Sequence, residues 1–384
     1  MDKDTLFSSF GKWVAPLNRK LISDWTLEFG DDRYVKKLHT LAYLLIFIDA
    51  QLQQHRGLRD IVADIQHHEG FHSELGMDSI STSQLSRKNN KVSPELLQQL
   101  FCDLVGQISK QSQPDCSRIG NVKLLDSTTV SLCLSKYKWA EYRKTKAGIK
   151  LHLRVAFCDP DTVYPEKAVL TSAKPADRTE MDSLIDETHV TYLFDRGYLD
   201  YAKFNPYSLD RIFFVTRLKD NAIIESLEEF NVPEHSLMTR DPMVKLGQGK
   251  KQTNMVFRLI ETTDLKGKAI RILTNRFDLT AEEIGDLYRN RWKIETFFRW
   301  IKQHLKLTRF YGEQEHAVWN QIWICLIAYA LLLLTKLELS TSKSLREVGR
   351  LLKVMRFRYW SEFREVVHRK LLRSSKGRQK VSKS

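Results

Sequence analysis

The chain has few of the residues that build disulfide-rich, collagen-like or disordered proteins. Its 384 residues include five cysteines, nine prolines and 16 glycines. The cysteines are odd in number and none forms a Cys-x-x-Cys pair. This argues against a disulfide framework or a zinc site and fits a reducing cytoplasm. Because 42% of the residues are hydrophobic, the chain can bury a real core, so a disordered or collagen-like chain is excluded.

Long apolar runs are also absent. The longest, Ile322 to Leu334, has 13 residues, which is too short to cross a bilayer and predicts a buried helix. The first ten residues contain no apolar secretory core. We therefore expect a cytoplasmic protein with no membrane partner.

Acidic residues are scarce only near the C-terminus. The net charge is +14, and residues 301–384 alone contribute +12, whereas residues 1–100 carry −1. A globular protein this basic usually meets a polyanion. A second basic patch, residues 136–154, holds seven cations and a single acid, Glu141. We expect it to follow a DNA backbone, although a solvated hairpin would have the same composition.

Residues 1–112 predict a helical N-terminal domain. Apolar residues at helical spacing mark a helix within 34–52, and Ser93-Pro94 is typical of a helix start. Gly76 precedes a short polar helix whose Ser81 and Gln84 have capping-box spacing and which ends in Arg87-Lys88. A helix-turn-helix that reads DNA with Arg87 and Lys88 fits this pattern, and so does a plain helical bundle. The histidines at 67, 68 and 72 lack a fourth metal ligand and fit a surface helix better than a zinc site.

Residues 118–340 alternate strand-like and helical segments, which indicates an α/β domain. Three alternating segments with glycine turns between them predict that residues 220–275 are β-rich. One long helix is expected over 280–306, and residues 341–384 should form a basic, helical C-terminal region.

Three acidic residues stand out in this domain. Asp126 lies in an apolar strand and Asp195 ends another. Each alone fits a turn or a helix cap, yet an aspartate in an apolar strand is costly to bury unless it is paired or metal-bound. Together with Glu295 they predict a three-carboxylate pocket. Oxygen ligands suit Mg²⁺ or Mn²⁺, and two such ions could assist an in-line phosphoryl transfer.

The segment around Glu295 has further polar residues at helical spacing. At about 100° per residue, one narrow helix stripe collects four of them: Tyr288, Arg291, Glu295 and Lys302. A carboxylate beside two cations and a phenol suits a metal-bound phosphate site. The alternative is an exposed helix with an ordinary Glu295–Arg299 ion pair.

These motifs together resemble the insertion-sequence-4 family of DDE transposases. The spacing Tyr288–Arg291–Glu295–Lys302 matches the family's signature without a gap. Leu125-Asp126-Ser127-Thr128 is similar to its first aspartate motif, and Phe194-Asp195-Arg196-Gly197-Tyr198 to its second. The resemblance covers about 120–335.

The resemblance implies an RNase H-like catalytic core interrupted by a β-rich insertion. It implies that Asp126, Asp195 and Glu295 hold two Mg²⁺ or Mn²⁺ ions, and that the other polar residues of the stripe grip phosphates. Trp292 could stack on a displaced base or pack in the core with Phe298. Because 220–275 contains no tryptophan, Phe257 or another residue would have to capture a flipped base.

The implied function is cut-and-paste transposition of a bacterial insertion sequence by a nucleoid-associated enzyme. Its partners would be double-stranded DNA, both terminal inverted repeats and target, and a second copy of the chain in a synaptic complex. The C-terminal helices are the expected dimer contact. The alternatives are a related nuclease, an inactive transposase derivative, or a non-enzymatic DNA-binding regulator, which would leave the three acids unexplained.

Overall fold

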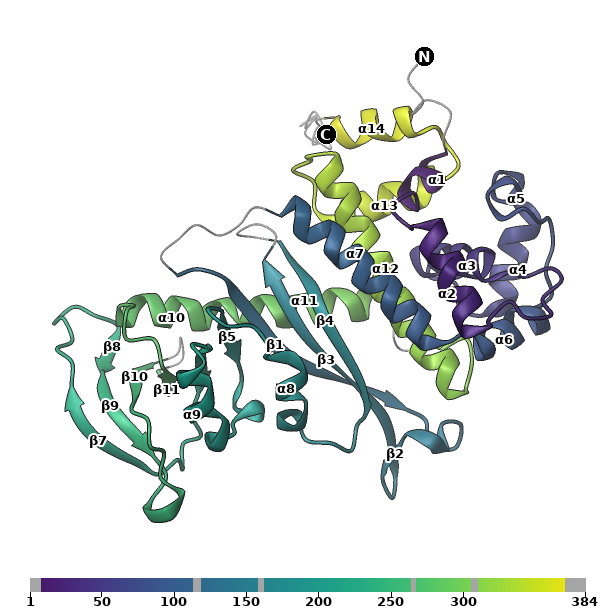
Figure 1. Cartoon of the computed structure of the whole chain (residues 1–384). Coiled ribbons are helices and arrows are strands. Elements are labelled where there is room, and N and C mark those ends of the chain that lie inside the picture. The colour runs from purple at the N-terminus through teal and green to yellow at the C-terminus, as the bar shows by residue number, and fades with distance from the viewer. Residues whose placement is uncertain (1–7, 113–118, 158–161, 264–266, 305–309, 370–384) are drawn as a thin grey trace, which may run out of the picture. The chain divides into compact units, whose positions relative to one another are not determined.

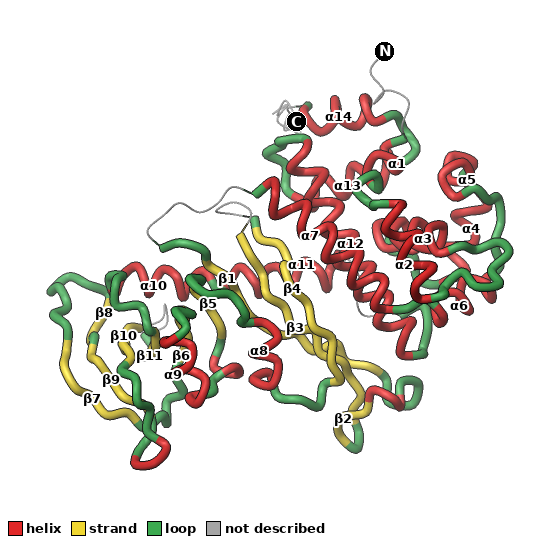
Figure 2. Tube along the Cα trace, viewed as in Figure 1, coloured by secondary structure: helices red, strands yellow, loops and turns green. Residues whose placement is uncertain are grey.

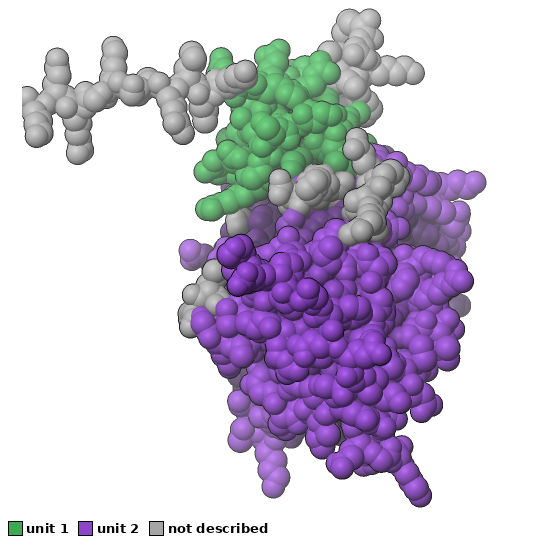
Figure 3. Space-filling view, turned by 90° about the vertical axis from the view of Figure 1, so that its left-hand side faces the viewer, with its two compact units in different colours: residues 1–16, 331–384 green, residues 17–330 purple. Residues whose placement is uncertain are grey.

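The computed structural model describes residues 8–112, 119–157, 162–263, 267–304 and 310–369. The basic tail from residue 370 onward lies outside the described residues. The chain divides into two compact units, residues 1–16 with 331–384 and residues 17–330, which Figure 3 shows in separate colours.

The smaller unit joins the two ends of the chain. It contains α1 (Ser9–Trp13), the last part of α12 (Glu315–Glu338), α13 (Leu345–Met355) and α14 (Trp360–His368). The backbone of Phe10 donates to the carbonyl of Arg356 at 2.7 Å. Phe10, Trp13 and Trp360 are buried, so large aromatic side chains form the core of this unit. The helices predicted for the C-terminal region are thus present.

Helix α12 contains the longest apolar run. By length and composition it could cross a membrane, but 94% of its most apolar 18-residue window is buried inside the protein. It is therefore a core helix, as the 13-residue run predicts.

The N-terminal helices begin the larger unit. They are α2 (Arg19–Phe29), α3 (Thr40–Gln53), α4 (Leu58–His67), α5 (Glu69–Leu75), α6 (Thr82–Lys91) and α7 (Pro94–Gln111). Helix α3 is buried almost throughout, since few of its residues are polar. Gly76 ends α5 in the left-handed region at φ 66°, where glycine has no steric penalty. Ser81 and Gln84 form the predicted capping box of α6.

Eleven strands form one sheet, drawn in yellow in Figure 2. They are β1 (Val122–Leu132), β2 (Glu141–Arg143), β3 (Lys146–Phe157), β4 (Val163–Ser172), β5 (Thr191–Phe194), β6 (Phe213–Arg217), β7 (Ile224–Glu229), β8 (Met238–Arg240), β9 (Pro242–Leu246), β10 (Phe257–Thr263) and β11 (Ala269–Thr274). The order along the sheet is β2-β3-β1-β5-β6-β11-β10-β9-β7, with β4 paired to β3 and β8 to β10.

The sheet changes character along its width. On one side β1, β3 and β4 pair antiparallel, and β1, β5 and β6 then pair parallel to one another. Beyond β6 the pairing is antiparallel again through β11 and β10. Residues 220–275 are therefore β-rich as predicted. They continue the central sheet through the β6–β11 pair instead of forming a sheet of their own.

Helices cover both faces of the parallel strands. They are α8 (Met181–Leu184), α9 (Tyr201–Leu209), α10 (Ala281–Asn290) and α11 (Trp292–His304). Figure 1 shows α11 crossing behind the strands, where it packs against β1 and β4, while α8 lies in front. The rings of Phe204 and Phe214 stack at 4.4 Å between centroids, so an aromatic core holds α9 on the sheet.

Over its described residues, 280–304, the long helix expected for 280–306 is in fact two helices, α10 and α11. The break falls at Arg291, whose amide bonds to the carbonyl of Tyr288 at 3.2 Å. The amide of Ile294 likewise bonds to the carbonyl of Arg291 at 3.2 Å. These bonds span three residues instead of four, so the turn tightens locally. The periodic sequence gave no sign of this, because it contains no proline or glycine at the break.

Candidate active site

The two predicted strand aspartates lie side by side on neighbouring parallel strands. The β1–β5 ladder ends at the pair Leu125 and Phe194, and Asp126 and Asp195 are the next residues on each strand. Asp195 also caps the following turn, since its Oδ1 accepts from the amide of Gly197 at 2.8 Å. The parallel register therefore places two carboxylates at the same level of the sheet.

Glu295 reaches the same place from α11. Its Oε1 accepts from Nη2 of Arg291 at 2.8 Å, and Nη1 of Arg291 lies 4.0 Å from Oδ2 of Asp126. The side chains of Asp126 and Glu295 are 19% and 33% exposed, so both remain accessible from solvent. We call Asp126, Asp195 and Glu295 the carboxylate site. Glu295 pairs with Arg291 and not, as the alternative supposed, with Arg299.

Negative charges repel one another in the carboxylate site. Burial and the negative charges of Asp195 and Glu295 together raise the pKa of Asp126 to about 7, although the Ser127 amide and Arg291 act to lower it. Like charges at close range disfavour ionisation. Among the described residues, the site is also too open for its three carboxylates to meet within 4.8 Å of one another. This arrangement leaves room for positive charge between the acids.

Two further residues of the predicted stripe join the carboxylate site. The guanidinium of Arg291 lies 5.7 Å from the ring centre of Tyr288. Burial raises the pKa of the Tyr288 hydroxyl, Asp195 raises it as well, and Arg291 and Arg217 act to lower it. Nε of Arg291 is buried and makes no hydrogen bond to any described residue. The guanidinium therefore keeps a donor for another acceptor.

The last two predicted contacts lie on the surface of α11. Trp292, at its first residue, is 61% exposed, whereas Phe298 is buried. Core packing of Trp292 against Phe298 is thus wrong, and the indole is free to meet another molecule. Lys302 is exposed farther along the same helix. Phe257 is fully buried against Phe204 and Phe214, so it cannot capture a base.

A polar network behind the carboxylate site was not predicted. Ser127, next to Asp126, donates to Oδ1 of Asp177 at 2.7 Å, and Lys150 pairs with the same oxygen at 3.1 Å. His152 is fully buried, with its Nδ1 3.7 Å from that oxygen and 3.4 Å from the Tyr198 hydroxyl. Burial lowers the pKa of His152 to about 4. Asp177 thereby holds the strand residue beside Asp126, and nothing in its local sequence signalled this.

Gly197 is needed for space at the same place. A Cβ on this residue would lie 2.9 Å from Oδ1 of Asp195 and 3.2 Å from Oδ2 of Asp177. Any larger residue would therefore push the Asp195 carboxylate. The sequence pattern Asp195-Arg-Gly-Tyr198 contains this glycine, but only the structure shows its reason.

Part of the predicted basic patch at 136–154 faces inward. Arg154 is buried and pairs with Glu166 at 2.7 Å, and Lys150 pairs with Asp177. The five other cations of the patch are exposed: Lys136, Lys138, Arg143, Lys144 and Lys146. The interpretation as a DNA-tracking patch is thus wrong for the two inward cations and stays a prediction for the exposed ones.

The two cations on α6 that were predicted to read DNA differ in exposure. Lys88 is 5% exposed, and its ammonium donates to Oδ1 of Asp32 at 2.6 Å and to Oγ1 of Thr40 at 3.0 Å. It is therefore an internal brace and cannot read DNA. Arg87 is exposed and stays a candidate.

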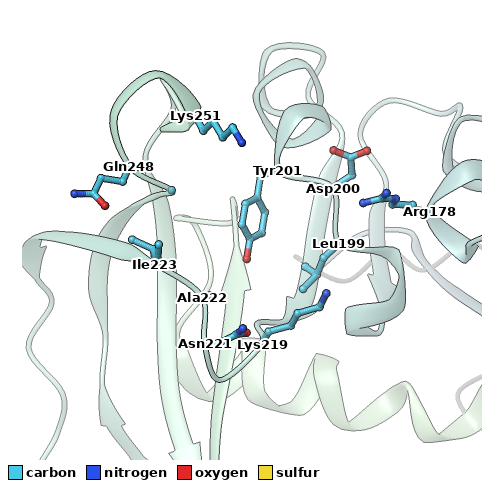
Figure 4. A pocket seen from close by; sticks show the side chains of 11 residues that line it. Arg178, Leu199, Asp200, Tyr201, Lys219, Asn221, Ala222, Ile223, Gln248 and Lys251 are labelled. Atoms are coloured by element: carbon cyan, nitrogen blue, oxygen red, sulfur yellow. The ribbon is translucent and has the colours of Figure 1, made fainter.

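A hollow of about 500 Å³ opens beside the segment that follows Asp195. Figure 4 shows Arg178, Lys219 and Lys251 around Tyr201, with Asp200 as the acidic neighbour. The three carboxylates do not line it. With three cations and one acid among these side chains, the hollow has an excess of positive charge.

Comparison with known proteins agrees with this chemistry. Residues 119–331 match the family model described as Transposase DDE domain, and residues 6–78 match a Domain of unknown function (DUF4372). The chain is 28% identical over 324 residues to the probable transposase for insertion sequence element IS5377 of Geobacillus stearothermophilus. That alignment covers 82% of this chain and 83% of the relative.

Two further likenesses are weaker. The putative transposase y4zB of Sinorhizobium fredii is 33% identical over 237 residues, which cover 60% of this chain and 64% of the relative. A solved structure of a piggyBac transposase synaptic complex with hairpin DNA aligns with 96% of this chain and 84% of that chain. Its TM-score is 0.47 and its sequence identity 10%.

Proposed function

The chain belongs to the family of DDE transposases, and we propose that Asp126, Asp195 and Glu295 are the acids that carry out its chemistry. As an insertion-sequence-4-type transposase, the protein is an enzyme that cleaves DNA and transfers the cut strand to new DNA. The observation that carries the proposal is that three carboxylates from β1, from the end of β5 and from α11 gather in one place, where Arg291 pairs with Asp126 and Glu295 and the Asp195 charge acts on Asp126.

The catalytic core in this proposal is RNase H-like. Three antiparallel strands, β4, β3 and β1, stand next to the parallel strands β5 and β6. Asp126 lies on the central strand of these five. Strands β7 to β11 and their connections are then the β-rich insertion, which ends before α10 and the helix that carries Glu295.

The carboxylate site fits two Mg²⁺ or Mn²⁺ ions. Hard carboxylate oxygens are the ligands these ions prefer, and the repulsion that raises the pKa of Asp126 would be relieved by added positive charge. When bound, the ions supply charge to the attacking and leaving oxygens of a phosphodiester displacement.

The protein's own side chains position the DNA around that centre. Arg291 holds Glu295 through Nη2 and presents its remaining donors to a phosphate beside the cleaved bond. The Tyr288 hydroxyl adds a second donor next to it. Exposed Lys302 contacts a phosphate farther along the strand, and exposed Trp292 stacks on a displaced base, which any base allows.

The reaction is cut-and-paste transposition at terminal inverted repeats. Water attacks the phosphorus at each transposon end and releases a 3′-hydroxyl. That hydroxyl attacks the opposite strand to form a hairpin, a second water opens it, and the freed 3′-hydroxyl attacks target DNA. Each step breaks one phosphorus–oxygen bond and forms another, so one carboxylate site serves all of them.

A homodimer would align the two transposon ends. The C-terminal helices offer exposed apolar side chains for this contact, Val354 at 80% and Tyr359 at 57% exposure. Val354→Glu should then weaken paired-end assembly while single-end DNA binding persists. Unchanged assembly would place the dimer contact elsewhere.

The direct test is cleavage of DNA that carries the element's terminal inverted repeats. Wild-type protein should cut it with Mg²⁺, and Glu295→Gln should not. Glu228, an exposed acid on β7, offers the matched control, so Glu228→Gln should cut like the wild type. Wild-type activity no higher than that of Glu295→Gln would contradict the proposal.

A further inference from the structure

A second cluster of potential metal ligands, separate from the carboxylate site, lies where the chain passes from α3 to α4. It consists of Asp49 on α3, His55 in the connection and Asp64 on α4, and we call it the α3–α4 corner. One ligand atom from each lies within 4.8 Å of the others. All three fall in the region that matches a domain of unknown function.

Asp49 is an unusual residue for its position. It is 1% exposed in a helix whose neighbouring side chains, Ile48 and Ala50, are also buried. Carboxylates are almost never buried so deeply unless they are paired or bind a metal. From the protein interior, Asp49 therefore presents a carboxylate oxygen to the side chains of His55 and Asp64.

His55 supplies an imidazole nitrogen at this place. Its Nε2 is buried, lies 3.5 Å from Oδ2 of Asp64, and makes no hydrogen bond to any described residue. The backbone around it is fixed, because its amide donates to the carbonyl of Ala50 at 3.1 Å and its carbonyl accepts from the Tyr311 hydroxyl at 3.1 Å. Gln54 makes the turn in the left-handed region at φ 61°.

Asp64 is oriented by a second histidine. Nδ1 of His68 lies 3.1 Å from Oδ1 of Asp64 and 3.0 Å from its backbone carbonyl. This leaves Oδ2 toward His55. Histidine–carboxylate contacts of this kind commonly set the direction of a ligand from outside the metal's own shell.

We propose that the α3–α4 corner binds one divalent transition-metal ion, with Zn²⁺ as the best fit. Imidazole nitrogen with carboxylate oxygen is a ligand set that Zn²⁺ accepts, whereas Mg²⁺ and Ca²⁺ favour oxygen alone. Three protein ligands leave a fourth position for water. The ion would clamp α3 to α4 at the turn on which Tyr311 rests, whose ring also meets Phe47 at 5.7 Å.

The test measures bound zinc in full-length protein that carries Asp126→Asn and Glu295→Gln, so that the carboxylate site does not contribute. After dialysis against Zn²⁺ and then against buffer, about one zinc ion per chain should remain bound. Co²⁺ bound in its place should show the visible absorption of a metal ion coordinated by the protein. Asp49→Asn and His55→Gln should each remove both signals. His68→Ala should weaken binding about 10- to 100-fold.

His67 provides the matched control because it is exposed on the same helix as Asp64. His67→Ala should bind zinc like its parent. If the parent retains no zinc, or if His55→Gln binds it as tightly, the proposal is wrong. Circular dichroism of each variant checks folding, and His55→Gln decides the matter should Asp49→Asn unfold, since His55 lies in a connection and not in a helix.

Discussion

The carboxylate site and the α3–α4 corner differ in how far they are enclosed. In the carboxylate site, Asp126 and Glu295 keep 19% and 33% of their side chains exposed, and an arginine is their cationic neighbour. In the α3–α4 corner, Asp49 is 1% exposed, and the imidazole of His55 lies in the same cluster and 3.5 Å from Asp64. We expect the more open site to admit a substrate and the ion in the more enclosed corner to hold α3 against α4. The first should govern activity and the second stability.

The largest effect is expected from Asp126→Asn. Cleavage should fall about 1000-fold or more, because several kcal/mol of transition-state stabilisation would be lost. The free energy of unfolding should stay the same or rise, since the change removes a buried charge from a group of like charges. Cleavage rates and urea unfolding of the same samples measure both. A large loss of stability together with the loss of activity would mean that the carboxylate site also stabilises the fold, against the distinction from the α3–α4 corner.

The next effect concerns pH and the network behind the carboxylate site. His152 has a folded pKa of about 4 against an ordinary 6.5. Its stabilising contribution is therefore complete above pH 6.5 and is lost as the pH falls toward 4, because only the unfolded chain takes up the proton. The difference amounts to about 3 kcal/mol at most. Between pH 7 and 4, the unfolding free energy of His152→Asn should decline less steeply than that of the wild type. Parallel declines would exclude His152 as a source of the pH dependence.

For the α3–α4 corner the expected effect is on stability alone. With free Zn²⁺ at 100 times its dissociation constant, the bound ion should add about 2.7 kcal/mol to the unfolding free energy. His55→Gln should lose this increment and still cleave DNA within about twofold of the wild type in Mg²⁺. Thermal unfolding with and without a zinc chelator provides the measurement. A large loss of cleavage at full stability would mean that the corner takes part in catalysis.

The smallest effect is expected from Gly197→Ala. The new Cβ would meet Oδ1 of Asp195 at 2.9 Å, and a flexible side chain can move away at little cost in stability. Displacing a catalytic group by a fraction of an ångström should lower cleavage by about 10- to 100-fold. Gly57, whose added Cβ would meet nothing within 4 Å, provides the control. Unaltered cleavage by Gly197→Ala would show that the position of Asp195 is not critical.

Much of the carboxylate site could be predicted because its information is local. The strand around Asp126, the strand end at Asp195 and the helical spacing around Glu295 are all properties of short segments. The capping box at Ser81 and the helix start at Pro94 were predictable for the same reason.

What could not be predicted depends on partners distant in sequence. Lys88 turns inward because it pairs with Asp32, 56 positions away. Arg154 turns inward because it pairs with Glu166, Asp186 and Glu187. Asp177 acts on Ser127, 50 positions earlier, and on Lys150 and His152. The α3–α4 corner likewise needs a buried aspartate, a loop histidine and a helix to meet, so no local pattern marks His55, whereas the histidines at 67, 68 and 72 stand close together in the sequence.

The central claim is that Asp126, Asp195 and Glu295 hold the ions that drive DNA cleavage, and metal rescue tests it most directly. Each acid is replaced in turn by cysteine, and cleavage of inverted-repeat DNA is compared in Mg²⁺ and in the softer Mn²⁺. We predict that all three variants are inactive in Mg²⁺ and regain measurable cleavage in Mn²⁺, while Glu228→Cys is active in both. Wild-type rates in Mg²⁺ for any one of the three would contradict the account.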